Sequence, residues 1–148
     1  MAKKRKASRG TRRVAFKPKI SAMLRWERVC RVATAGSGGM PHLVPVCHVL
    51  VRDRLYFGSG DDARKVLHLR ENPQLALTVD VYTDTWPQLR GVMVQGRARL
   101  IERGAAFQRI RKALYAKYPQ YPREAAIAPS DSTIVELIPT SVFAWGLD

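Results

Sequence analysis

The chain has few cysteines, few acidic residues and no long apolar run. Its 148 residues include two cysteines, Cys30 and Cys47, and only 12 acidic residues against 26 lysines and arginines. The cysteines form no C-x-x-C pair, and no Cys/His cluster accompanies them, so the sequence predicts free thiols and no metal site. No apolar run approaches the ~20 residues of a membrane-spanning helix. The basic N-terminus also lacks the apolar stretch of a secretory signal, and we therefore expect a cytoplasmic protein.

Sequence motifs of the common catalytic classes are also missing. The chain has no G-x-S-x-G nucleophile turn, and its three histidines are scattered. The glycine-rich residues 36–39 lack the Lys-Ser/Thr ending of a phosphate loop and are better interpreted as a hairpin turn. Asp61 and Asp62 stand where a helix is expected to begin, and capping of that helix is enough to explain them. The sequence therefore leaves the catalytic residues unknown.

The positive charge is concentrated at the N-terminus. Of the formal net charge of +14, nine basic residues and no acidic one fall within residues 1–19. Charge of this density predicts a solvated, disordered tail over residues 1–17, and residues 18–148 are then one domain. Such a tail would attract nucleic acid or anionic lipid without specificity. No aromatic residue precedes Phe16, so the tail offers no platform on which bases could stack.

The remaining sequence alternates short strand-like runs with amphipathic helices. With 46% hydrophobic residues, the chain can bury a sizeable core. Periodicity and turn residues predict helices that begin at Pro18 and at Asp61 or Asp62, and a third over residues 104–118. The predicted strands cover residues 29–35, 42–51, 55–57, 75–81, 92–101, 133–138 and 142–145. Seven strands with hairpin turns and three helices indicate a mainly β protein, a barrel or a sandwich.

Residues 58–65, with the sequence Gly-Ser-Gly-Asp-Asp-Ala-Arg-Lys, are the most suggestive segment for ligand binding. A turn that leads into a helix leaves main-chain N–H groups free, and Arg64 and Lys65 add positive charge there. Together these groups could hold a phosphate. The alternative is an ordinary capped helix with two solvated bases, and the residues by themselves do not decide between the two.

The order of these segments resembles a known family. Two strand-like runs, a Gly/Ser turn, a helix that starts with Arg64 and Lys65, and a Trp-containing link between two strands occur within residues 44–100. This series resembles the pyridoxamine 5'-phosphate oxidase-like family of split β-barrels, which use FMN or F420. The pattern D-x-Y-x-D-x-W-x-x-L, which runs from Asp80 to Leu89, resembles a subgroup often predicted to use F420. The resemblance implies a homodimeric split β-barrel with the cofactor at the subunit interface.

The resemblance also implies a set of cofactor-binding residues. In the family, main-chain groups of the strand before the helix contact the isoalloxazine ring, and an Arg-Lys or Ser-Lys pair grips the phosphate. The positions of this chain that match are His42, Val44, Pro45, Val46, Cys47, Phe57, Gly58, Ser59, Arg64, Lys65, Trp86, Arg90 and Gly91. Trp86 is expected to flank the ring, to fill the dimer interface or to cap the barrel end. Many relatives have Gln at the position of Arg90 or Gly91, and this chain does not.

The implied function is hydride transfer between the cofactor and an unidentified small substrate. FMN is expected first because it is widespread, and F420 second because basic residues would suit its longer acidic tail. Pyridoxamine-phosphate oxidases proper have a C-terminal segment with Trp and Arg groups, and no counterpart is evident here, so that oxidation is not expected. Two other classes stay open: a noncatalytic flavin- or haem-binding protein on the same barrel, and a nucleic-acid-associated protein that uses the tail.

Overall fold

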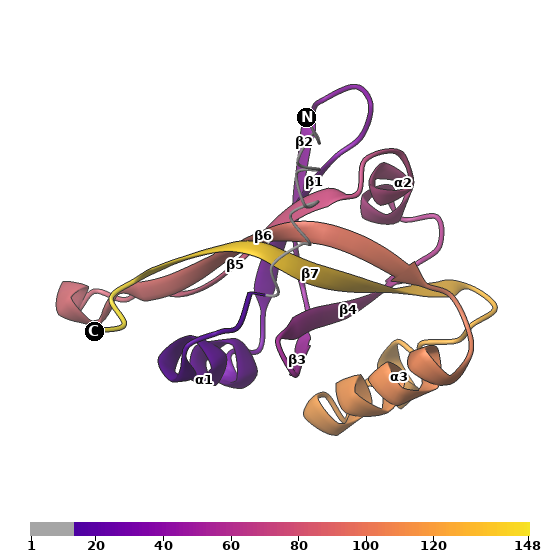
Figure 1. The fold of residues 1–148 in the computed structure, drawn as a ribbon. Coiled ribbons are helices and arrows are strands. Elements are labelled where there is room, and N and C mark those ends of the chain that lie inside the picture. Colours follow the sequence, from indigo (N-terminus) through magenta and orange to yellow (C-terminus); the bar gives the residue numbers. More distant parts are fainter. Residues whose placement is uncertain (1–13) are drawn as a thin grey trace, which may run out of the picture.

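A computed structural model describes residues 14–148 of the chain, so most of the predicted tail lies outside the described residues (Figure 1). Phe16, within the described part of that segment, is buried, and its N–H donates to Asp53 Oδ1 at 3.3 Å. The helices are α1 (Pro18–Trp26), α2 (Arg64–Glu71), α3 (Ala105–Lys117) and α4 (Tyr121–Glu124), with a 3-10 turn η1 (Trp86–Gln88). The strands are β1 (Cys30–Ala35), β2 (Pro41–Val46), β3 (Val49–Val51), β4 (Arg54–Gly60), β5 (Gln74–Val81), β6 (Arg90–Ile101) and β7 (Ser132–Trp145).

The seven strands form one antiparallel sheet in the order β2-β1-β5-β6-β7-β4-β3. Two apolar clusters pack on it. The larger cluster includes Leu24 of α1, Phe57 of β4 and Leu77 of β5, and the smaller one joins α3 to β4 and β7 through residues such as Phe107 and Ile134. The mainly β architecture predicted from the sequence is confirmed. No helix among residues 14–148 is long and apolar enough to cross a membrane.

The prediction of one strand over residues 42–51 is wrong. The segment forms β2 and β3, which lie at opposite edges of the sheet, and the chain crosses between them at Cys47 and His48. His48 is fully buried there, and its ring Nε2 lies 2.7 Å from the carbonyl oxygen of Leu24. The hydroxyl of Tyr118 accepts the N–H of His48 at 3.0 Å. A run of apolar residues did not reveal this crossing because it depends on partners 24 and 70 positions away.

The prediction of two closing strands is also wrong, because β7 is continuous over residues 132–145. β7 pairs with β6 along almost its whole length, and the register shifts between Gln95 and Gly96. A Cβ atom at Gly96 would lie only 2.2 Å from the carbonyl oxygen of Ile138. Glycine at position 96 therefore lets β6 and β7 approach each other closely where their register shifts. Pro139, opposite Gly96, sits at this irregularity and had suggested a break in the strand.

Both cysteines are free thiols, as predicted. Cys30 is fully buried, and burial raises the pKa of its thiol to about 12. Cys47 is only partly buried.

Burial of His48 generates a pH-dependent stability. Because a carbonyl oxygen can only accept, Nε2 of His48 carries the proton toward Leu24. Desolvation by burial, followed by the charge of Lys117, lowers the pKa of His48 from 6.5 to about 4. The unfolded state thus takes up a proton at a higher pH than the folded state does. This contribution to stability is complete above pH 6.5 and is lost as the pH falls to about 4.

We expect His48→Gln to remove about 3 kcal/mol of the decrease in unfolding free energy between neutral pH and pH 4. Urea denaturation of wild type and variant over a series of pH values is the measurement. His68→Gln, at a partly exposed histidine, is the control, and its unfolding free energy should depend on pH as that of the wild type does. If the unfolding free energy of His48→Gln falls with pH as steeply as that of the wild type, His48 does not cause the acid sensitivity.

Candidate functional site

The N-terminus of α2 has no side-chain cap. The helix begins at Arg64, its N-cap residue is Ala63, and its first turn contains no acidic residue. The predicted capping by Asp61 or Asp62 is therefore wrong. Asp61 instead accepts a hydrogen bond of 2.6 Å from the hydroxyl of Thr133 on β7, which fixes the loop before the helix. The first N–H groups of α2 and the partial positive charge of the helix end are thus left to a ligand or to solvent.

Four basic or titratable side chains gather beside this helix end. Lys65 is half-buried, and burial lowers the pKa of its ammonium group. The pKa of His42 on β2 is also lowered, by burial of the ring and then by the positive charges of His68, Lys65 and Arg64. The rings of His42 and His68 meet edge to face with centroids 5.8 Å apart. No acidic group contributes to the pKa shifts of Lys65 and His42, whereas His68 has the carboxylate of Glu71 nearby.

His42 has an unpaired polar atom at this site. Its Nδ1 is buried and has no hydrogen-bond partner among the described residues. His68, by contrast, is held by Thr34, whose Oγ1 lies 3.1 Å from Nδ1 of His68. The sequence analysis did not identify His68 as a site residue. Nothing in a single sequence connects positions 42 and 68, because β1 and β2 bring His42 to the helix only in the folded chain.

The β2 and β4 residues of the expected site lie along two strands next to this cluster. β2 is an edge strand, so Pro45, which lacks an N–H, can occupy it, and its side chain is exposed. Val44, Val46 and Cys47 are partly buried. On β4 the ring of Phe57 is fully buried in the larger apolar cluster, and Ser59 is partly exposed. A Cβ atom at the adjacent Gly58 would lie 2.9 Å from Cδ1 of Ile127, so glycine leaves room there for that side chain.

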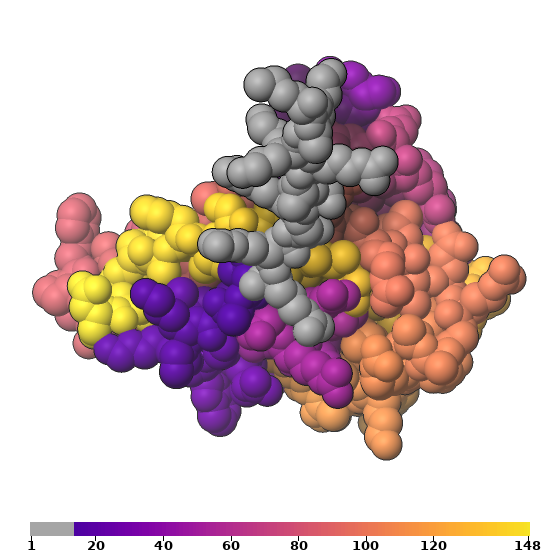
Figure 2. Space-filling model, in the orientation of Figure 1, coloured from indigo at the N-terminus to yellow at the C-terminus, as the bar shows by residue number. Residues whose placement is uncertain are grey.

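Trp86, Arg90 and Gly91 lie at the other end of the sheet. Arg90 pairs with Val81 at the end of β5, whereas Leu75 at the start of β5 pairs with Thr34, which in turn pairs with His42. At ~3.3 Å per residue, the six steps along β5 separate the two groups by about 20 Å. Figure 1 shows this end of β5, β6 and β7 extending away from α2, and Figure 2 shows the same end projecting beyond α1.

Trp86, Arg90 and Gly91 differ in their exposure and in their contacts. Trp86 is 78% exposed, so most of its surface is left to solvent in the single chain. Arg90 donates from Nη1 to the carbonyl oxygen of Gln88 at 3.0 Å. Gly91 is buried, and a Cβ atom there would lie 2.1 Å from the ring of Trp145. Nε1 of Trp145 is itself buried without a partner among residues 14–148. The ring of Trp145 thus fills the space beside Gly91.

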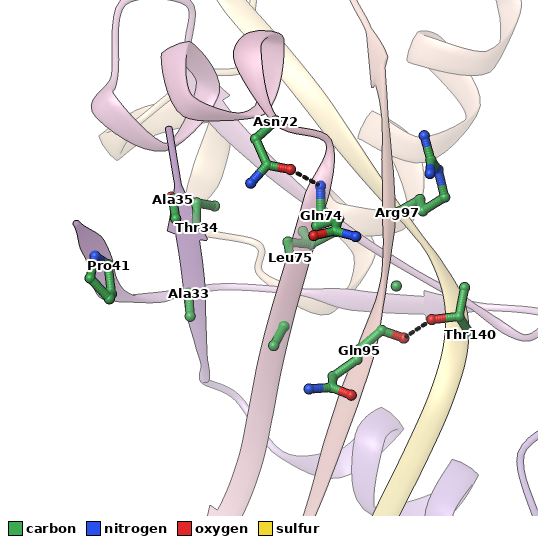
Figure 3. A pocket seen from close by; sticks show the side chains of 12 residues that line it. Ala33, Thr34, Ala35, Pro41, Asn72, Gln74, Leu75, Gln95, Arg97 and Thr140 are labelled. Atoms are coloured by element: carbon green, nitrogen blue, oxygen red, sulfur yellow. Dashed lines mark hydrogen bonds between the residues drawn. The ribbon is translucent and has the colours of Figure 1, made fainter. Parts of the chain in front are cut away.

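A cavity of ≈ 560 Å³ lies outside both groups, on a face of β1, β5 and β6 (Figure 3). Small side chains such as Ala33, Ala35 and Ala76 make much of its floor. Polar groups at its rim bond to one another: Asn72 accepts the N–H of Gln74 at 3.2 Å, and Thr140 donates to the carbonyl oxygen of Gln95 at 3.3 Å. None of the thirteen residues expected to bind the cofactor lines it.

Comparisons with known proteins agree with the fold. A conserved hypothetical protein of Mycobacterium tuberculosis has a TM-score of 0.74 and 20% identity, over 89% of this chain and 85% of that one. The haem storage protein HutZ of Vibrio cholerae has a TM-score of 0.74 and 15% identity, over 88% and 94%. An F420 reductase has a TM-score of 0.69 and 18% identity, over 86% and 98%.

These solved structures share a fold with the chain at identities too low to transfer an activity, and no curated protein matches the sequence. The sequence model described as pyridoxamine 5'-phosphate oxidase matches residues 16–146, which is nearly all of the part that the structure describes. The mainly β fold with a curled antiparallel sheet is the split β-barrel that the sequence predicted. The chain belongs to the pyridoxamine 5'-phosphate oxidase family.

Proposed function

We propose that the chain binds a flavin, FMN first and F420 as the alternative, and transfers hydride to or from a small substrate. The observation that carries the proposal is the uncapped N-terminus of α2 with Arg64 and Lys65 in its first turn. Free main-chain N–H groups, a helix dipole and two cations form an anion site that suits a phosphate group. Lys65 is half-buried with no acidic partner contributing to its pKa, which is the condition that a bound phosphate would relieve.

The remaining residues fit the other parts of such a cofactor. The edge strand β2 offers main-chain groups of Val44 and Val46 to a flat ring, and the buried, unpaired Nδ1 of His42 offers a polar contact. The bound flavin would supply the hydride chemistry, while these residues would orient it and exclude water from one face. No residue is assigned an acid or base role.

Two subunits would unite the two groups of the site. Trp86 and Arg90 cannot reach the α2 group within one chain across a separation of about 20 Å. In a homodimer with a two-fold axis, the exposed end of one chain can lie against α2 of its partner, and each site then takes residues from both chains. The exposure of Trp86 supports this arrangement, because a large, mostly exposed aromatic side chain suits an interface.

A noncatalytic haem-binding role is the second candidate. His42 presents a neutral imidazole with a free ring nitrogen, and neutral imidazole is a common ligand of haem iron. One structural neighbour is a haem storage protein and another is a haem-binding protein. The cations Arg64 and Lys65 would then be available to the propionate groups of haem.

Lys65→Ala should weaken flavin affinity by about 1.5–3 kcal/mol, the value of a hydrogen bond to a charged group. Titration of the apoprotein with FMN and with F420, followed by fluorescence, is the measurement. Arg70→Ala removes a positive charge at the other end of α2, where Arg70 pairs with Glu102, and should bind like wild type. Unchanged affinity of Lys65→Ala for both cofactors would remove the α2 terminus from the site.

Mixing two defective variants tests the shared site. Lys65→Ala and Arg90→Ala should each bind flavin weakly. In a heterodimer of the two, one of the two sites combines an intact Lys65 with an intact Arg90. Random mixing should therefore restore wild-type affinity in about a quarter of the sites. If mixing restores nothing while light scattering shows that subunits exchange, the site lies within one chain or excludes Arg90.

The absorption spectrum of the purified protein separates flavin from haem. We expect a yellow protein whose cofactor, released by denaturation and identified by mass, is FMN or F420. Reduction of the bound cofactor by an added electron donor, followed by reoxidation with an acceptor, would support an enzyme over a carrier. A haem spectrum in wild type that is lost in His42→Ala would instead establish the second candidate.

A further inference from the structure

A second basic cavity lies at the α3 side of the sheet, apart from α2. It has a volume of ≈ 250 Å³, and its polar walls are Arg52, Arg54, Tyr56, Arg99, Arg109 and Glu136. Tyr56 and Phe57 are successive residues of β4 and therefore point to opposite faces of the sheet. Phe57 packs in the larger apolar cluster and Tyr56 in the smaller cluster beneath α3.

Strand register brings the central groups of this cavity together. Glu136 of β7 stands opposite Tyr56 of β4 on one side and opposite Arg99 of β6 on the other. The three side chains form one row across three strands. Arg54 lies two residues before Tyr56 on the same face, and Arg109 reaches the cavity from α3. Arg52, in the turn before β4, has a left-handed φ of 52°, which a residue other than glycine seldom adopts.

The floor of the cavity is a buried carboxylate with its own partners. Glu136 is 1% exposed; its Oε1 accepts from Arg54 Nη1 at 3.2 Å and from Arg99 Nε at 2.9 Å. Its Oε2 accepts from the hydroxyl of Tyr56 at 2.7 Å. Burial and this bond raise the pKa of Tyr56 to about 12, so the phenol stays a donor. The carboxylate is therefore satisfied without any further cation.

The arginines exceed what Glu136 requires. One carboxylate balances one guanidinium, so three positive charges around the cavity have no counterpart. Arg54 and Arg99 each use a single nitrogen for Glu136, and their other N–H groups are free to donate elsewhere. Arg52 and Arg109 form no ion pair with any residue in the described part of the chain. Arg52, Arg99 and Arg109 are exposed, so water screens much of their mutual repulsion, and an anion in the hollow would relieve what remains.

We propose that this cavity binds the phosphoryl group of a small phosphorylated molecule. The forked N–H groups of arginine match the paired oxygens of a phosphate, and several guanidinium groups around one hollow suit an anion with more than one negative charge. Glu136 acts as the positioning residue that holds Arg54 and Arg99 in place. This site is distinct from the flavin site, because none of the thirteen residues expected to bind the cofactor lines it.

Calorimetric titration of the full chain with pyrophosphate tests the site, and the affinity should fall as salt is added. Arg109→Gln should weaken binding about tenfold, as expected for the loss of a charged hydrogen bond. Arg52→Asn should act similarly, and asparagine tolerates the left-handed backbone there. Lys112→Gln is the matched control: it removes one charge from the same helix outside the cavity and should bind like wild type. Neither Arg52 nor Arg109 forms an ion pair, so both variants should fold.

Two further titrations distinguish this site from other anion sites. Pyrophosphate binding that survives in Lys65→Ala and weakens in Arg109→Gln supports the cavity, whereas the reverse pattern places the anion at α2 and overturns the proposal. Equal affinity in wild type, Arg109→Gln and Lys112→Gln would also overturn it, because binding would then be nonspecific. Citrate at the same ionic strength should bind more weakly than pyrophosphate. If it binds as tightly, the cavity is a carboxylate site and the phosphoryl assignment is wrong.

Discussion

The hydroxyl of Tyr118 holds the junction on which the rest of the fold depends. It accepts the N–H of His48 and lies 2.8 Å from the carbonyl oxygens of both His48 and Arg28, so it joins the end of α3 to the crossing between β2 and β3. The neighbouring Lys117 donates from Nζ to the carbonyl oxygen of Glu27 at 2.7 Å. This crossing sends the chain from one edge of the sheet to the other. After this crossing the chain forms β3 and β4, and the following helix α2 lies against β1, where Thr34 contacts His68.

The two basic sites differ in whether an acidic side chain pairs with their positive groups. At the α3 side a buried carboxylate, Glu136, organises two arginines and leaves positive charge around a hollow. At α2 the half-buried Lys65 and the buried nitrogen of His42 have no acidic neighbour that balances them. The α2 groups are therefore partly desolvated, which costs free energy, whereas Arg52 and Arg109 are exposed and keep their hydration.

The family alone does not decide the cofactor. Neighbours with this fold at similarly low identity include a haem storage protein and an F420 reductase, so the split barrel serves more than one ligand class. The proposal of a flavin for this chain rests on the uncapped α2 terminus, with Arg64 and Lys65 in its first turn. The distance between that terminus and Trp86 favours a site shared by two subunits, because a single flat ring cannot bridge about 20 Å.

The sequence by itself determined the class of fold, most element positions and the family. The helical spacing of apolar residues after Pro18 and the alternation of apolar and polar residues near 92–101 are local patterns. Such patterns can be recognised without knowing which distant residues they contact. The segment around Arg64 and Lys65 was recognisable for the same reason. Only the tertiary structure decided that residues 42–51 divide at His48, that Asp61 bonds Thr133 instead of capping α2, and that Glu136 gathers arginines. Each of these depends on side chains far apart in the chain, and pairing between distant positions leaves no periodic pattern in one sequence.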